Sequence, residues 1–170
     1  MSSYARDRAF SDRYTSALCR ILGPFLIRPA PLVLDIREAT DLMVFTTSDI
    51  RIAARVRSPG YLEWYPDDFT IRFHRHDTGA KTEMAKILEG FADWMIYGHA
   101  DPNGAPEIAE WMIIDLNSFR YHLEVNESVI QWKLLGNRDY ATSFLAFDVT
   151  SFPDDPPILI GRSQRLVAVS

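Results

Sequence analysis

The sequence predicts an α+β fold in which a mixed central β-sheet is flanked by two main helices. Three observations predict it. The chain has 170 residues, 47% of them hydrophobic and 24% charged, which suits one globular domain. Two segments carry apolar residues at helical spacing, and the runs between and after them alternate or stay apolar as strands do. Helices separated by runs of strands are typical of the α+β class, so we expect one domain over residues 1–170, with a core at about 10–116 and a strand-rich extension at about 117–170.

The first helix is predicted to begin at Ser11, whose hydroxyl can cap it, and to end at Gly23-Pro24. Its apolar positions are Phe10, Tyr14, Leu18, Ile21 and Leu22. Cys19 lies on the same stripe, so we expect a small core residue there rather than a catalytic thiol. The second helix is predicted to span about four to five turns and to end at Gly98. Its apolar positions are Met84, Ile87, Leu88, Phe91 and Met95.

A β-hairpin is predicted at the centre of the fold, with Thr40–Phe45 running back through Arg51–Arg57. Both runs are rich in β-branched and apolar residues, and a Thr-Ser-Asp turn separates them. Trp111–Leu116 is almost continuously apolar, which is typical of a buried central strand. Further strands are predicted at Leu32–Ile36, Phe69–Arg75, Tyr121–Val125, Val129–Leu135 and Ser143–Val149, with a final edge pair at Ile158–Ile160 and Leu166–Val169.

Arginines gather on one face of the second hairpin strand. Because side chains alternate along a strand, Ile52 and Val56 point to the opposite face. Two sets of basic side chains are candidates for one nucleic-acid-binding surface: Arg51, Arg55 and Arg57 on the hairpin, and Arg72 and His74 on Phe69–Arg75. Arginine can grip phosphate through two parallel hydrogen bonds. The alternative is a solvated sheet face whose arginines pair with nearby acids, namely Asp49, Glu63 and Asp68.

The formal net charge is −5, so any nucleic-acid contact must come from a local basic patch rather than from the whole surface. The single cysteine excludes an internal disulfide framework and suits a reducing compartment. Met1–Arg8 lacks the pattern of a signal peptide, and the longest apolar run, Phe91–Tyr97, is too short to span a bilayer. We therefore expect a soluble, cytoplasmic protein without a membrane partner.

Common catalytic and nucleotide-binding motifs are absent from the sequence. It contains no Gly-rich phosphate loop followed by lysine, no G-x-G-x-x-G, no H-E-x-x-H and no G-x-S-x-G. His74 and His76 could share a face and ligate a metal, but no nearby Cys or third His completes a site, which favours surface or packing histidines. Tyr61, Trp64 and Tyr65 could stack on bases or pack at the domain edge.

The two hairpin strands resemble a known family. Ala39–Val44 followed by Ile50–Arg57 is similar to the paired strands of the PD-(D/E)XK nuclease superfamily, in which an Asp opens one strand and the next carries an acidic-x-Lys pattern. The resemblance covers the first 116 residues and implies a restriction-endonuclease-like core. A longer run also resembles uncharacterised phage-type proteins of this superfamily, for which the location would be the host cytoplasm; it adds Phe69–Arg72, Thr82–Ile87 and Trp111–Leu116.

The resemblance implies catalytic roles for particular residues. Asp41 would be the metal ligand that holds Mg²⁺ against the scissile phosphate, and Arg55 or Arg57 would stabilise the developing charge. The acidic-x-Lys position is degenerate here, since it reads Ala53-Ala54-Arg55 or Arg55-Val56-Arg57 and lacks a carboxylate.

Other residues are candidates to replace the missing groups. The absent acid could be supplied by Glu38 or Glu83, and Lys86 could be a migrated lysine. The alternatives are that Asp41 is a turn or cap residue and that Glu83 and Lys86 form a surface ion pair. Asp115, which ends a predicted strand, could be either a helix cap or a site residue.

Three functions stay open from the sequence. The first is a metal-dependent nuclease that acts on DNA or RNA. The second is a catalytically inactive module that binds nucleic acid or a protein through the same arginines. The third is a phage assembly or structural protein that forms a homo-oligomer through the edges of its strand-rich extension.

Overall fold

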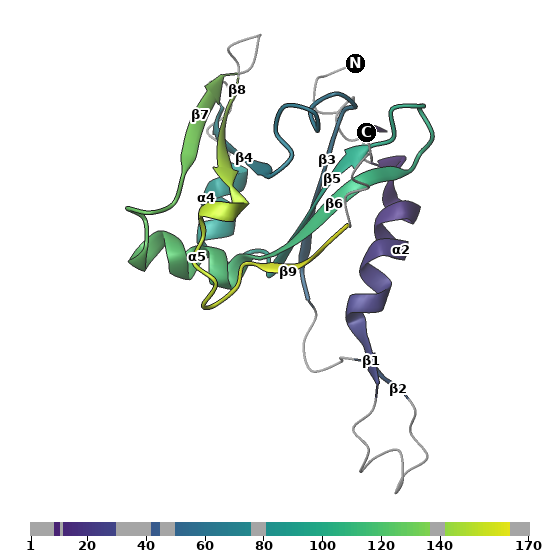
Figure 1. The fold of residues 1–170 in the computed structure, drawn as a ribbon, viewed down its shortest axis with the longest axis horizontal. Helices are drawn as coiled ribbons and strands as arrows, with labels where there is room; N and C mark the ends of the chain where they lie inside the picture. The colour runs from purple at the N-terminus through teal and green to yellow at the C-terminus, as the bar shows by residue number, and fades with distance from the viewer. Residues whose placement is uncertain are drawn as a thin grey trace, which may run out of the picture.

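Residues 9–10, 12–29, 42–44, 50–75, 81–136 and 142–163 are described by a computed structural model (Figure 1). The elements, in chain order, are α2 (Thr15–Leu26), β1 (Ile27–Pro29), β2 (Leu42–Val44), β3 (Ile52–Arg57), β4 (Asp68–Arg75), α4 (Glu83–Leu88), β5 (Trp94–Ala100), β6 (Ile108–Asp115), α5 (Leu116–Val125), β7 (Trp132–Gly136), β8 (Thr142–Asp148), the 3₁₀-helix η1 (Val149–Ser151) and β9 (Leu159–Arg162). The predicted α+β class, with a mixed sheet flanked by helices, is confirmed. The predicted strands Leu32–Ile36 and Leu166–Val169 lie outside the described residues, as do Glu38, Asp41, Asp49 and His76.

A four-stranded sheet in the order β3-β5-β6-β9 forms the middle of the fold. It is mixed, because β3 and β5 are parallel whereas β5–β6 and β6–β9 are antiparallel. β6 is an interior strand, and its residues Ile113 and Ile114 have no exposed surface. The buried central strand predicted from the apolar run at Trp111–Leu116 is therefore confirmed.

Helix α2 covers one face of this sheet (Figure 1). Tyr14 and Leu18 pack there against Ile96 and Ile113. The predicted helix end at Gly23-Pro24 is wrong, since α2 continues through both residues to Leu26. Pro24 has no N–H to donate to the carbonyl four residues earlier, so the helix loses one hydrogen bond there, and it ends two residues later at Leu26.

The core position predicted for Cys19 is also wrong, because this residue is exposed. Its neighbour Leu18 is buried against the sheet. Successive helix residues are about 100° apart at 3.6 residues per turn, so Cys19 falls beyond the edge of the buried stripe.

A second layer covers the other face of the sheet. It consists of the three-stranded antiparallel sheet β4-β8-β7 together with α4 and α5 (Figure 1). The main core lies between the two layers and is rich in aromatic rings, for example Phe69, Phe119 and Phe147, which are at most 1% exposed. The segment after residue 117 is built into both layers, because β8 pairs with β4 and β9 pairs with β6.

The predicted central hairpin is wrong. β2 pairs with β1 in antiparallel register, with Met43 opposite Arg28. β3 instead pairs in parallel with β5, so that Arg55 lies opposite Tyr97 and Arg57 opposite His99. Adjacency in sequence favoured the hairpin, but β5 offers β3 a strand that is almost completely buried, and this long-range pairing forms instead.

The predicted long second helix is also wrong. Helix α4 spans only Glu83–Leu88, and Gly90 follows it with φ 78°, a left-handed conformation that ends helices. The remainder of the predicted helix is strand β5, with Gly98 inside it. A Cβ on Gly98 would lie 3.0 Å from Ile108 Cγ2, so close strand packing accounts for this glycine.

Helix α5 occupies the segment Tyr121–Val125, for which a strand was expected. Asp115 caps it, since its carboxylate accepts hydrogen bonds from the N–H groups of Asn117 and Ser118 at 2.7 and 3.0 Å. Of the two roles considered for Asp115, the structure shows the helix cap. No helix among the described residues is long and apolar enough to cross a membrane.

Replacing Asp115 with Ala should lower the free energy of unfolding by about 1 kcal/mol, because two N–H groups at the start of α5 lose their acceptor. Chemical denaturation of both proteins measures the difference. Asp115→Asn, which keeps a capping oxygen, should recover most of the loss, and an equal loss in both variants would contradict the cap.

Candidate functional site

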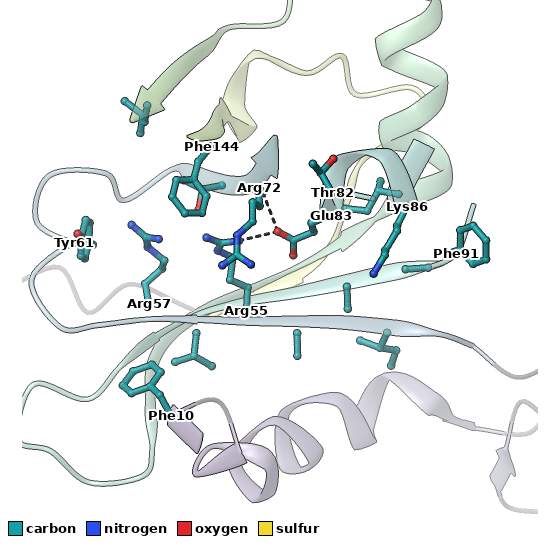
Figure 2. Close-up of a pocket in the computed structure, with 18 of the residues that line it drawn as sticks. Phe10, Arg55, Arg57, Tyr61, Arg72, Thr82, Glu83, Lys86, Phe91 and Phe144 are labelled. Atoms are coloured by element: carbon teal, nitrogen blue, oxygen red, sulfur yellow. Dashed lines mark hydrogen bonds and ion pairs between the residues drawn. The ribbon is translucent and has the colours of Figure 1, made fainter. Parts of the chain in front are cut away.

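A cleft of about 1160 Å³ lies between β3 and the three-stranded sheet, with α4 along one side (Figure 2). Six cationic side chains line it: Arg51, Arg55, Arg57, Arg72, Lys81 and Lys86. Glu83 is the one carboxylate among the described lining residues. We call this region the arginine cleft. Its strong positive charge contrasts with the net charge of −5 on the whole chain.

Arg55 and Glu83 meet at the centre of the arginine cleft (Figure 2). Arg55 Nη1 lies 2.7 Å from Glu83 Oε2, and the same oxygen accepts the backbone N–H of Arg72 at 2.9 Å. The Arg55 side chain is only 13% exposed, and burial lowers the pKa of its guanidinium from the usual value. Glu83 therefore neutralises a nearly buried cation and ties α4 to β3 and β4.

Three arginine side chains of the cleft lie close to the ring of Phe144 on β8. The guanidinium of Arg55 lies 4.7 Å from the centre of the Phe144 ring, and those of Arg72 and Arg57 lie at 5.8 and 5.9 Å. Arg57 also lies over the Tyr61 ring at 4.3 Å. Cation–π contacts of this kind, together with the Glu83 carboxylate, hold three like charges near one another.

The cations at the other end of the cleft are partly neutralised. Arg51 binds the Asp93 carboxylate with two 3.1 Å contacts, and this hydrogen bonding holds the pKa of Asp93 below its usual range. Lys81 pairs with Glu89. Arg57 and Lys86, by contrast, form no ion pair with any carboxylate in the described part of the chain.

The predicted basic surface is thus largely brought together. Ile52 and Val56 pack toward α2, and the arginines of β3 face the second layer, as strand alternation predicts. The expected neighbourhood of Arg72 and His74 is not formed, because a β-bulge between them puts Arg72 opposite Phe144 and His74 opposite Ser143. His74 is exposed and is not among the described lining residues of the cleft.

The acidic partners differ from the predicted ones. Arg55 pairs with Glu83 and Arg51 with Asp93, and neither pairing was expected. Glu83 and Lys86 both line the arginine cleft, but the ion pair of Glu83 is with Arg55. Asp41, the predicted metal ligand, lies outside the described residues.

The described lining of the arginine cleft offers a divalent cation a single carboxylate. No group of three or more His, Cys, Asp or Glu side chains occurs among them in a metal-binding arrangement. Glu83, the carboxylate of the cleft, already serves a guanidinium and a backbone N–H. A hard cation such as Mg²⁺ normally takes two or more oxygen ligands from carboxylates and substrate phosphate.

Sequence patterns missed several residues of the cleft. Phe144 lies in a correctly predicted strand, but nothing in its spacing marks it as the ring that three arginines approach. Lys81 lies just before α4, and Phe91 joins the lining where the chain turns after α4 at Gly90. Gly90, just before Phe91, is the sequence signal that the helix ends there, and Phe91 is exposed in the structure.

Comparisons with protein-family models, with curated proteins and with solved structures find no match to this chain. The interpretation of the arginine cleft rests on its own geometry and chemistry.

Proposed function

We propose that this protein binds nucleic acid through the arginine cleft. The observation that carries the proposal is the excess of cationic side chains in the cleft: six line it against one described carboxylate, and two of the six, Arg57 and Lys86, pair with no carboxylate among the described residues. Guanidinium groups suit phosphate because they offer several N–H donors in a fixed planar arrangement. A chain with a net charge of −5 would be repelled by polyanions elsewhere, so binding would be confined to this cleft.

The size of the cleft also supports a polymeric ligand. Pockets for small molecules usually enclose about 300–1,000 Å³ and are mostly apolar. The arginine cleft, at about 1160 Å³, lies slightly above that range, and charged groups line its centre (Figure 2). Arg57 and Lys86 offer cations that no described carboxylate occupies, so phosphates can be bound there without breaking an existing pair.

The nuclease activity implied by the PD-(D/E)XK resemblance is a further candidate on the same surface. It requires Asp41, together with a second acid, to hold a divalent cation near the arginines. Among the described residues, Glu83 is the candidate for this second acid, because it lies within the arginine cleft beside Arg55. Cleavage assays with Mg²⁺ or Mn²⁺ on wild type and Asp41→Ala separate the two activities: metal-dependent cleavage that Asp41→Ala abolishes supports a nuclease, and equal cleavage in both removes it.

Replacing Arg57 with Ala should weaken nucleic-acid binding by about tenfold, because a charge-assisted contact contributes roughly 1.4 kcal/mol or more. The slope of log K against log salt should also fall by about 0.7–0.9, the value for one phosphate contact. Fluorescence anisotropy with labelled DNA and RNA at several salt concentrations measures both quantities.

Arg20→Ala is the matched control. Arg20 lies on α2 and forms an exposed ion pair with Glu107, and neither residue lines the arginine cleft. The substitution therefore removes the same charge at a distance from the cleft lining. Its affinity and salt slope should equal those of wild type. Equal losses in both variants would mean that only overall charge matters. A protein that binds no nucleic acid but forms a symmetric oligomer in light scattering would instead favour the assembly role.

A further inference from the structure

Exposed aromatic rings lie at both ends of the arginine cleft. Tyr61 is 45% exposed at one end and Phe91 is 59% exposed at the other, and Figure 2 shows Arg57, Arg55 and Lys86 between them. Both rings line the cleft. Large rings are usually more buried than this, and contiguous exposed rings beside a functional surface often mark a contact site.

The loop between β3 and β4 presents several rings together. The N–H groups of Trp64 and Tyr65 both donate to the carbonyl of Tyr61, at 3.3 and 3.0 Å, so these residues form one helical turn. Residues at this spacing project to one side of a turn. All three rings are exposed, and Trp64 is the most exposed of them. The loop therefore presents three exposed rings within one short turn.

The spacing of charges and rings matches a flexible polyanion. Arg57 and Arg51 are six residues apart along an extended segment, which corresponds to about 20 Å at roughly 3.3 Å per residue. Several phosphates of an extended strand fit within that length. The bases of a single strand have free faces that can stack on rings, whereas those of a duplex are stacked on one another and present only their edges.

Resting on the proposed function, we infer that the ligand of the arginine cleft is single-stranded nucleic acid. Arg57 and Lys86 contact its phosphates, and Tyr61 and Phe91 stack on bases at the two ends. Tyr61 is prepared for this role, because Arg57 lies over one face of its ring at 4.3 Å and fixes the ring's orientation. Stacking tolerates any base, so the binding is expected to depend little on sequence.

Three labelled probes of equal length test the inference by fluorescence anisotropy: a single strand, the duplex of the same sequence and an abasic single strand with the same phosphates. Each is prepared in DNA form, and the single strand also in RNA form. Wild type should bind the single strand about tenfold more tightly than the duplex or the abasic strand, as expected for one or more stacked bases. Tyr61→Ala should lose this preference while its binding to the abasic strand stays unchanged, and Tyr61→Phe, which keeps the ring, should retain it.

The control is Trp132→Ala, which removes an exposed ring on β7 that does not line the arginine cleft and should bind all probes as wild type does. Equal affinity of wild type for the single strand and the duplex, or for the single strand and the abasic strand, would overturn the inference and leave the proposed function standing. The absence of salt-sensitive binding to every probe would overturn the proposed function itself. Tighter binding of either the DNA or the RNA strand would show which of the two the cleft prefers.

Discussion

Replacing Glu83 with Gln should lower the free energy of unfolding by about 2 kcal/mol and raise the affinity of the cleft for nucleic acid by about tenfold. The stability loss follows from Arg55, whose side chain is 13% exposed and whose ion-pair partner is Glu83, 28% exposed. Removing one partner of a fully buried pair costs about 3–5 kcal/mol, and that of a surface pair about 0–1 kcal/mol. The Arg55–Glu83 pair is partly buried, so the expected loss of stability lies between these two values.

The affinity for nucleic acid should rise because the substitution removes a negative charge from the cleft. The Glu83 carboxylate holds Arg55 at 2.7 Å and is the one negative charge among the described lining residues. Glutamine keeps an oxygen that can accept the Arg72 N–H, but it neither repels phosphate nor competes for Arg55. Urea denaturation and anisotropy titrations of the same protein preparation measure the two effects. A change in stability without any change in affinity would mean that phosphates do not approach Arg55.

The control for this substitution is Glu107→Gln. It makes the same chemical change in an ion pair with Arg20, whose side chains are 62% and 50% exposed and lie outside the cleft lining. Its effect on stability should stay within about 0.5 kcal/mol, and its nucleic-acid affinity should equal that of wild type. A comparable loss of stability in Glu107→Gln would show that the environment of Arg55 is not special.

Local patterns predicted several of the strands, but missed β5 and predicted the pairing of strands poorly. The apolar run that became β6 and the alternating run that became β4 were both recognised, because the residues that decide them are adjacent in sequence. The partner of β3 is decided by β5, which lies about 40 residues further along the chain. Nothing within Ile50–Arg57 specifies that parallel pairing over a hairpin with Thr40–Phe45.

The second helix was mispredicted because two different structures share one apolar spacing. Met84 and Ile87 are buried in α4, whereas Leu88 and Phe91 are more than half exposed, and Met95 belongs to β5. A short, fully apolar run is compatible with either a buried helix or a buried strand, so periodicity could not separate them. Gly90 was the local signal that a helix ends there.

The candidate site was predictable only in part. Alternation along β3 was enough to put Arg55 and Arg57 on one face, and this needs no knowledge of the fold. The roles of Glu83 and Phe144 depend on how α4 and β8 approach β3 in space, and no pattern within either segment encodes that approach. The environment of His99 on β5 could not be predicted either, because its neighbours come from β3 on one side and β6 on the other.

Acidification should destabilise this protein through His99. The imidazole is 3% exposed, neither ring nitrogen has a hydrogen-bond partner among the described residues, and the ring lies edge-on to Tyr97 at 5.5 Å. Arg57 on β3 and Glu110 on β6 are opposite it in the sheet. Burial, with a smaller contribution from the charge of Arg57, lowers the pKa of His99 from 6.5 to about 4.

The direction of the pH effect follows from proton uptake. Between about pH 6.5 and pH 4 the unfolded chain protonates this imidazole while the folded chain does not, so the free energy of unfolding falls as the pH falls through that range. The loss should approach roughly 3 kcal/mol and level off below the lower value. Above pH 6.5 His99 is neutral in both states and contributes no pH dependence.

Replacing His99 with Leu should remove this acid sensitivity and leave the protein at neutral pH as stable as wild type or up to about 2 kcal/mol more stable, because two unsatisfied buried nitrogens disappear. Denaturant titrations from pH 7 to pH 4 on both proteins give the difference curve, in which the titration of all other groups cancels.

The matched control is His122→Leu, at an equally buried histidine whose ring nitrogens lie 2.7 Å from Pro156 O and 2.9 Å from Asn126 Nδ2. That variant should lose about 2 kcal/mol already at neutral pH, since it leaves both partners unsatisfied. Parallel pH curves for wild type and His99→Leu would show that the imidazole takes up its proton equally in the folded and unfolded chain, which would contradict the lowered pKa.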